Sequence, residues 1–238
     1  MYLAESQCHI CLGVAFSTMD MKKPYPITSW PGSKEVVAWK VPTRVGYRAG
    51  CMGCKSWGFE CPEPEEFDTG MDVIECFKLY LDPSFLKTRE HNPENVFWKD
   101  GDVKMWFRDF LTALHKHIVK DISKTFNELG EPGLGDWNPR TVEYIFSFPT
   151  SWRTTSVVET FEEIVTEAGF GNCKNHSVII KLTEAEAAAV YAAKNPKHQH
   201  PVHPRNQSTE SLPAEVSQPR EGHTLLICDS GGGTTVGL

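Results

Sequence analysis

The chain has 238 residues, of which 40% are hydrophobic, and its formal net charge at pH 7 is −7. This apolar content is enough for the packed core of one large domain or two small ones. An acidic chain without a basic block is not expected to bind nucleic acid or membrane phosphates, because such binding depends on clustered lysine and arginine.

The sequence also predicts a compartment. No apolar run approaches the roughly 18 residues of a membrane span, and the N-terminus lacks a basic segment followed by an apolar one. We therefore expect a cytoplasmic protein without a membrane partner. In that reducing compartment the eight cysteines are expected to be free thiols or metal ligands rather than disulfides.

The first half of the chain predicts strands followed by one long helix. Residues 13–60 are rich in glycine, proline, tryptophan and β-branched types, and short runs such as Val36–Trp39 predict strands joined by tight connections. From Asp102 to Leu129 the apolar residues recur at steps of three and four, which predicts a helix. Its histidines, His115 and His117, flank a lysine and are expected on the wetter face.

The second half alternates predicted strands with predicted helices. The strands are expected at Tyr144–Phe148, Ser177–Leu182 and Thr224–Cys228, and the helices at Val157–Ala168 and Glu184–Ala193. Strands separated by helices of this size imply an α/β layer structure with parallel neighbours.

A segment of different composition separates the last predicted helix from the last strand. Residues 195–221 are dense in Pro, His, Gln, Ser and Glu and almost free of large apolar side chains. Such a segment cannot bury enough surface to order itself, so we predict a disordered insertion. Residues 1–194 and 222–238 then form one folded unit.

A glycine-rich turn follows the last predicted strand directly. Glycine has no Cβ and reaches positive φ without strain, so the backbone can come close to a ligand. Successive N–H groups and a threonine hydroxyl can then converge on an anion, while an aspartate at the strand end can hold hydrated Mg²⁺ or orient water. The predicted phosphate-binding residues are Asp229, Gly231, Gly232, Gly233 and Thr234.

This turn resembles the second phosphate motif of the heat-shock protein 70 chaperones, which belong to the actin-like ATPase superfamily. Order and spacing agree over about Tyr144–Thr234, interrupted by the insertion, and shorter matches extend the likeness over most of the chain, most closely to a divergent, often fungal, branch. The matching segments are Tyr144–Pro149 with Trp152, Glu159–Phe170, Leu182–Ala189, Gly13–Ser17, Ile27–Gly32, Lys40–Thr43, Trp57–Phe59 and Phe77–Pro83.

The resemblance implies an α/β fold, the first lobe of an actin-like nucleotide-binding domain with a mixed, ribonuclease-H-like sheet flanked by helices and incomplete at both ends. It implies ATP and Mg²⁺ as cofactors, ATP or ADP as ligand, and protein clients or co-chaperones as partners. Three residues would be catalytic. Glu184 matches an acid that orients Mg²⁺-bound water, Lys78 a lysine near the γ-phosphate, and Asp229 the acid of the phosphate motif.

The chain departs from the family in three places. Ser6–Leu12 stands where the family has a D-x-G-T-T-x-S-G turn, so the acid and the threonine pair are missing. Val236 follows Thr235 where the family usually places an aspartate, and the second lobe is not part of the sequence. We therefore expect weak or undetectable ATPase activity from this chain alone, because phosphoryl transfer depends on preorganised charge in a closed cleft. The departures favour a truncated gene product.

Two further functions stay open beside the chaperone-like one. A non-catalytic remnant or interaction module would keep the α/β fold and bind no nucleotide, and the missing phosphate turn favours it. A sugar or acetate kinase of the same superfamily is a weaker alternative, because the segments Pro149–Trp152 and Phe77–Pro83 resemble the chaperone branch more closely.

A zinc site is the competing hypothesis for the cysteines. Two C-x-x-C pairs with a further histidine and cysteine nearby could supply four thiolates. The separation between the pairs is longer than in a compact zinc ribbon, so thiols without a metal are the expected state. The residues concerned are Cys8, His9, Cys11, Cys51, Cys54 and Cys61.

Overall fold

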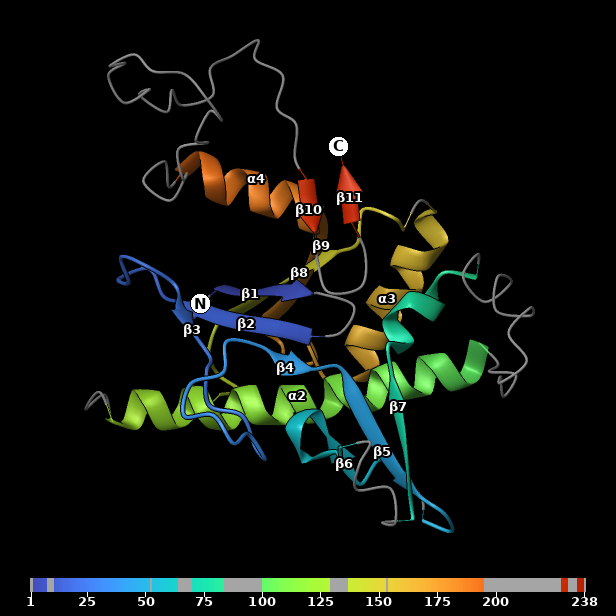
Figure 1. Ribbon diagram of the computed structural model, residues 1–238. Coiled ribbons are helices and arrows are strands. Elements are labelled where there is room, and N and C mark those ends of the chain that lie inside the picture. Colours follow the sequence, from blue (N-terminus) through green and yellow to red (C-terminus); the bar gives the residue numbers. More distant parts are fainter. Residues whose placement is uncertain are drawn as a thin grey trace, which may run out of the picture.

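The structure, a computed structural model, describes residues 2–7, 11–51, 53–63, 70–83, 100–128, 137–152, 154–194, 228–230 and 235–237. A mixed sheet and the helices that cover it make up the centre of the molecule (Figure 1). The expected α/β class is therefore confirmed. No helix in the described ranges is long and apolar enough to cross a membrane.

The main sheet has six strands in the order β3-β2-β1-β8-β9, with β4 paired to β2 outside this path. β1 and β2 form an antiparallel pair, whereas β8 lies parallel to both β1 and β9. The strand bounds are Tyr2–Gln7 for β1, Cys11–Ser17 for β2, Tyr25–Pro26 for β3, Val41–Pro42 for β4, Val142–Phe148 for β8 and His176–Thr183 for β9. The sheet is therefore half antiparallel and half parallel.

Two smaller sheets and two short helices complete the strand-rich part. The order β6-β5-β7 joins Ser56–Trp57, Arg44–Arg48 and Met71–Glu75, and β10 (Cys228–Ser230) pairs antiparallel with β11 (Thr235–Gly237). The 3-10 helices are η1 (Gly58–Glu60) and η3 (Phe77–Leu81). The predicted strand Thr224–Cys228 overlaps β10 at Cys228, and its other residues lie outside the described ranges.

Three α-helices pack against the main sheet. They are α2 (Asp100–Glu128), α3 (Thr155–Glu167) and α4 (Glu184–Lys194), so the helices expected in these regions are confirmed. α2 and α3 lie on one face of the sheet and α4 lies beyond the other (Figure 1). The apolar stripe of α2 is buried in the core, with Phe107, Phe110, Leu114, Ile118 and Ile122 at most 1% exposed.

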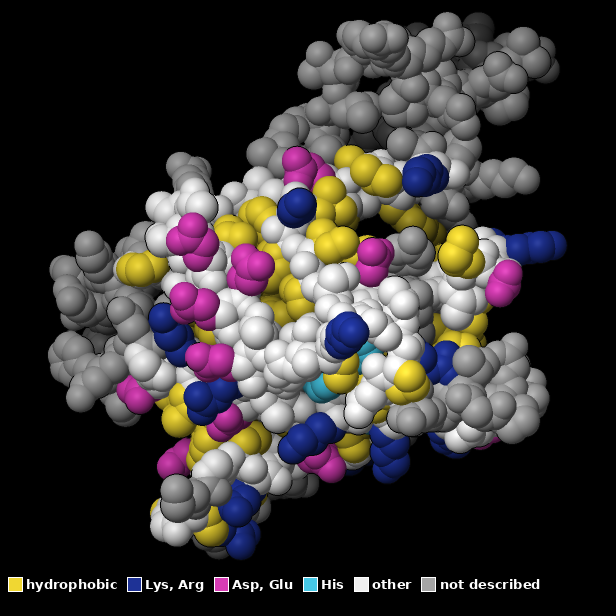
Figure 2. Space-filling view, turned by 180° about the vertical axis from the view of Figure 1, so that it is seen from behind, with side chains coloured by type: hydrophobic (Ala, Val, Ile, Leu, Met, Phe, Trp, Pro, Cys, Tyr) yellow, Lys and Arg dark blue, Asp and Glu magenta, His cyan; other side chains and the backbone are white. Residues whose placement is uncertain are grey.

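The helix α3 shows why its sequence forms an amphipathic surface helix. Val157, Phe161 and Ile164 recur at helical spacing and are buried, and Phe161 stacks on Phe107 of α2 with ring centroids 5.4 Å apart. The opposite face carries four exposed glutamates. Seen from behind, acidic side chains gather on the side of the molecule where α3 lies (Figure 2).

Two expectations about local structure are wrong. Val36–Trp39 forms no strand, since these residues lie in a loop in which Val36 is 95% exposed and Trp39 is 68% exposed. Only Ala38 is buried, where its carbonyl oxygen accepts a hydrogen bond from Trp30 Nε1. The expectation that His115 and His117 face water also fails, because both rings are half-buried against aromatic side chains.

Gly169 ends α3 in a backbone conformation that requires glycine. Its φ is +107°, and a Cβ at this position would meet His115 Nδ1 at 3.2 Å. We expect Gly169→Ala to lower the free energy of unfolding by about 1–3 kcal/mol through backbone strain. Gly101→Ala is the matched control, because Gly101 lies in the first turn of α2 with open space around it, so this variant should not lose stability. Urea unfolding of the two variants would measure both changes, and an unchanged Gly169→Ala would contradict the strain.

Candidate functional site

The carboxyl ends of the parallel strands lie at one edge of the main sheet. β8 ends at Phe148 and β9 ends at Thr183, and these two residues are paired across the ladder. β1 runs parallel to β8 and ends at the same edge. Ligands of open α/β sheets bind outside the carboxyl ends of the strands, so this edge is where a site is expected.

Glu184 stands at this edge because α4 begins where β9 ends. Thr183 and Glu186 form a capping box, in which the Thr183 backbone N–H donates to Glu186 Oε2 at 2.9 Å and the Glu186 N–H donates to Thr183 Oγ1 at 3.2 Å. These bonds from Thr183 hold the pKa of Glu186 below its usual value. The cap therefore fixes the first turn of α4, on which Glu184 lies.

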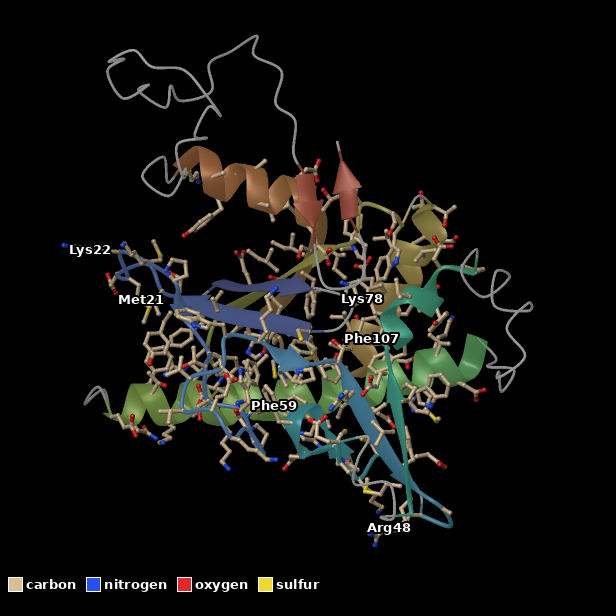
Figure 3. All side chains as sticks on the ribbon, viewed as in Figure 1. Met21, Lys22, Arg48, Phe59, Lys78 and Phe107 are labelled. Atoms are coloured by element: carbon tan, nitrogen blue, oxygen red, sulfur yellow. The ribbon has the colours of Figure 1, made fainter. Side chains whose placement is uncertain are left out.

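Lys78 reaches the same place from the second sheet. After β7, Cys76 adopts a left-handed conformation with φ 56°, which turns the chain into η3. The neighbouring Phe77 is fully buried, and its ring lies 5.6 Å from that of Phe107 on α2. Figure 3 labels Lys78 and Phe107 in the same part of the view. Aromatic packing of η3 on α2 thus holds the lysine in the interior.

Lys78 and Glu184, predicted from separate motifs, form an ion pair. Lys78 Nζ lies 2.6 Å from Glu184 Oε1, and the two side chains are 2% and 15% exposed. The ammonium also lies 5.9 Å from the ring centroid of Trp152, which follows the end of β8. A charge-assisted hydrogen bond at this burial is stronger than a surface salt bridge, because little water screens it. The pair therefore places one positive and one negative group at the carboxyl edge of the sheet.

Trp152 is a contact residue to which the sequence analysis gave no role. It is 5% exposed and stacks on Phe148 with ring centroids 6.5 Å apart. The available signal was its place directly after a predicted strand, where an aromatic residue can cover the strand end. It excludes water from one side of Lys78, which strengthens the electrostatic interactions there.

The predicted phosphate turn is only partly within the described residues. Asp229 lies in β10, and Gly231, Gly232, Gly233 and Thr234 lie outside the described ranges. β10 contacts α4 and stands beside the end of that helix at which Glu184 lies (Figure 1). The strand that carries Asp229 is therefore near the Lys78–Glu184 pair.

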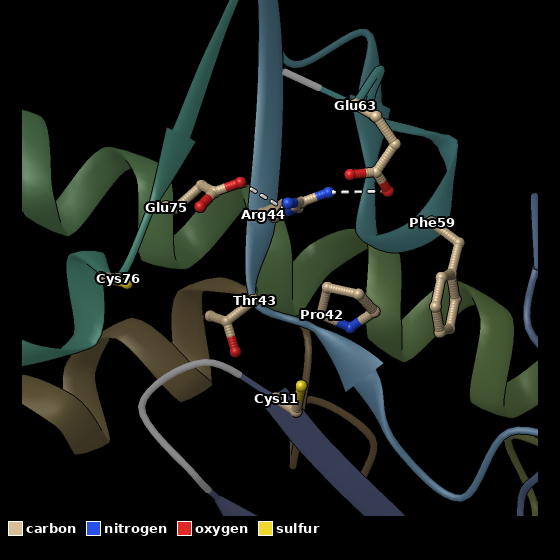
Figure 4. Close-up of a pocket in the computed structure, with 8 residues that line it drawn as sticks. All are labelled: Cys11, Pro42, Thr43, Arg44, Phe59, Glu63, Glu75 and Cys76. Carbon is tan, nitrogen blue, oxygen red and sulfur yellow. Dashed lines mark hydrogen bonds and ion pairs between the residues drawn. The ribbon is translucent and has the colours of Figure 1, made fainter. Parts of the chain in front are cut away.

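A small pocket lies next to η3 but is not suited to anions. It has a volume of about 190 Å³ and is lined by residues that include Cys11, Arg44 and Cys76 (Figure 4). Arg44 pairs with Glu63 at 3.2 Å and also with Glu75, so its charge is already balanced by two carboxylates. The charged side chains that line this pocket are therefore paired with one another.

The cysteines within the described ranges show no metal centre. No group of three or more His, Cys, Asp or Glu side chains in those ranges is placed to hold a metal ion. The Cys54 thiol donates to the Ser56 carbonyl oxygen at 2.9 Å, and burial raises the pKa of Cys61 to about 11. Without a metal, both thiols are therefore harder to deprotonate than an exposed cysteine. Cys8 and His9 lie outside the described ranges.

Comparisons of the chain with protein-family models, with curated proteins and with solved structures found no match.

Proposed function

We propose that this chain binds the phosphates of ATP with Mg²⁺ as a nucleotide-binding lobe of the heat-shock protein 70 type. The observation that carries the proposal is the ion pair between Lys78 and Glu184, which are 106 positions apart in sequence. The resemblance assigns both residues to one site, and their contact supports that assignment. A mixed sheet with helices on both faces is also what a ribonuclease-H-like lobe requires.

The side chains at this site have the chemistry that ATP phosphates and Mg²⁺ require. Lys78 supplies an ammonium group for a phosphate oxygen, and Glu184 supplies a carboxyl group of the type that holds water on Mg²⁺. When bound, Mg²⁺ neutralises phosphate charge. The protein's part is to hold Lys78 beside Glu184 and near the ring of Trp152. This arrangement supports phosphate binding in the ground state.

We also propose that the chain hydrolyses ATP only weakly. In the family the opposite side of the phosphates is held by the turn between the first two strands. Here the hairpin formed by β1 and β2 carries Ser6–Leu12 at that position, with no acid and no threonine pair. Part of the charge stabilisation for phosphoryl transfer is therefore missing, whereas phosphate binding depends less on it.

Mg-ADP and Mg-ATP titrated into the purified chain test the proposal, with binding followed by calorimetry and turnover by phosphate release. We expect saturable binding with little or no turnover. Lys78→Met should weaken binding at least about tenfold, because a hydrogen bond to a charged group contributes about 1.5–3 kcal/mol. Lys22→Ala is the control, since Lys22 is exposed at the other end of the molecule (Figure 3).

The outcomes separate the candidate functions. Absence of binding by a chain that is folded by circular dichroism would favour the non-catalytic interaction module. Binding that Lys78→Met leaves unchanged would place the nucleotide elsewhere. Sugar-dependent consumption of ATP would instead favour a kinase of the same superfamily.

A further inference from the structure

A second groove lies along the face of α2 that points away from the main sheet. Its volume is about 470 Å³, and its walls are α2, the residues from Gly53 to Trp57, and Pro31. On α2 the lining positions recur at steps of three and four, as one face of a helix does. Pockets of about 300–1,000 Å³ hold small organic ligands, so the groove is large enough for one.

The floor of the groove is apolar and aromatic. Trp57, which is 9% exposed, and Ala113 line it, and the His117 ring lies 5.9 Å from Trp57 and 5.2 Å from Trp30. His117 Nε2 lies 2.8 Å from the Ser29 carbonyl oxygen, to which it donates. Burial lowers the pKa of His117. The imidazole is therefore neutral at pH 7, and the floor offers flat, uncharged surface to a ring.

Three lysines give the rim a positive charge. Lys55, Lys116 and Lys120 line the groove, and all three are exposed. None of them forms an ion pair with a carboxylate within the described ranges. Like charges four residues apart on a helix repel each other, so Lys116 and Lys120 concentrate positive charge on this side of the groove. The chain as a whole is acidic, with a net charge of −7, whereas this rim carries three lysines.

The lining also holds two acidic residues, one of which is engaged by partners of its own. Asp109 accepts a hydrogen bond from the Tyr47 hydroxyl at 2.9 Å and lies 3.6 Å from the Arg108 guanidinium. Its carboxylate is therefore engaged by partners of its own. Glu60, the other acid, is exposed and lies on η1 across the groove from α2.

We propose that this groove binds a small organic anion with an aromatic or apolar body, whose ring covers Trp57 and Ala113 while its carboxylate, sulfonate or phosphate meets Lys116, Lys120 and Lys55. The groove uses none of the residues of the Lys78–Glu184 site, so this inference does not rest on the proposed nucleotide binding. It assigns a ligand to the stretch of α2 that borders β6 and η1.

Anilinonaphthalene sulfonate is a suitable probe, because it joins an aromatic body to an anionic group and fluoresces when it leaves water. We expect saturable binding that weakens as salt is added. Phenylnaphthylamine, which has the same rings without the sulfonate, should bind at least about tenfold more weakly, a difference of about 1.4 kcal/mol. Equal binding of the two probes would overturn the proposal, since the lysines would then contribute nothing.

Substitution of the lysines locates the probe. Lys116→Gln with Lys120→Gln changes two exposed helix positions and should weaken binding about tenfold without unfolding the chain. Lys124→Gln is the matched control, one turn further along α2, where Lys124 pairs with Glu128 instead of lining the groove. The proposal fails if the double variant binds the probe as the wild type does while Trp39→Ser abolishes binding. The probe would then lie on the loop that carries Trp39.

Alkylation of the cysteines gives a second measurement at the site itself. Cys54 lines the groove, and Cys51, three residues earlier, is exposed and outside the lining. Burial raises the pKa of Cys54, so its alkylation is slow and needs long incubation with iodoacetamide in mildly alkaline buffer, during which saturating probe should slow modification of Cys54 and leave Cys51 unchanged, as read by tandem mass spectrometry. Equal protection of both thiols, or of neither, would contradict binding in the groove.

Discussion

Glu184→Ala is expected to lower the free energy of unfolding by about 3–5 kcal/mol, because it leaves the buried Lys78 ammonium without its carboxylate. Lys78 Nζ lies 2.6 Å from Glu184 Oε1, and the lysine side chain is only 2% exposed. Exposed α3 glutamates such as Glu162 provide a control, since Glu162→Ala should change stability by less than about 0.5 kcal/mol. Urea unfolding followed by circular dichroism measures both.

The double variant shows whether the loss belongs to the pair. Lys78→Met with Glu184→Gln removes both charges and keeps side chains of similar length, so most of the stability should return. A double variant as unstable as Glu184→Ala would mean that the loss comes from the packing of α4 and not from the broken ion pair. The same ion pair lies at the proposed phosphate site. The cycle therefore measures what the pair contributes to folding, separately from what it contributes to ligand binding.

The elements that the sequence predicted correctly are those whose apolar spacing reaches the core. The stripe of α2 and the run of β8 are long and periodic, and their side chains are buried as the spacing requires. The predicted strand at Val36–Trp39 was wrong for the opposite reason. Its apolar residues are exposed on a loop, and a short apolar run does not reveal whether anything covers it.

The candidate site shows a second limit of prediction from sequence, which concerns contacts between residues far apart in the chain. Spacing along the chain could not bring Lys78 and Glu184 together, because β7 leads into one and β9 into the other, and only the assembled topology makes them neighbours. The one signal was the resemblance, which assigned both to one cleft. For His115 a signal existed in the periodicity itself. His115 lies four residues after Leu111 and three before Ile118, both fully buried, and so belongs to the same stripe.

His115 is expected to make the fold sensitive to acid. Its ring lies 4.6 Å from Phe170, and its Nε2 lies 3.3 Å from the Tyr144 hydroxyl, which accepts a hydrogen bond from Trp137 Nε1. Burial, with a smaller contribution from the charge of His176, lowers the pKa of His115 to about 4. The neutral imidazole is thus the form that the folded chain accommodates, and Tyr144 is placed to donate to it.

The direction of the pH effect follows from this lowered pKa. In the unfolded chain His115 takes up a proton near its ordinary pKa of about 6.5, whereas in the folded chain it does so only near 4. The stability it contributes is therefore complete above about pH 6.5 and is lost as the pH falls toward 4. The loss should reach about 2 kcal/mol once solvent screening of a half-buried ring is allowed for.

Urea unfolding across this pH range tests the effect on the wild type and on His115→Gln, which keeps a polar side chain but cannot take up the proton. The variant should be less stable at neutral pH, and the difference from wild type should shrink as the pH falls. His176 and His117 also have lowered pKa values and remain in both proteins, so their contributions cancel in that difference. Lys116→Gln, which alters the exposed neighbour, should keep the wild-type slope. If the gap between wild type and His115→Gln stayed constant down to the acid limit, the buried imidazole would not be the source of the pH dependence.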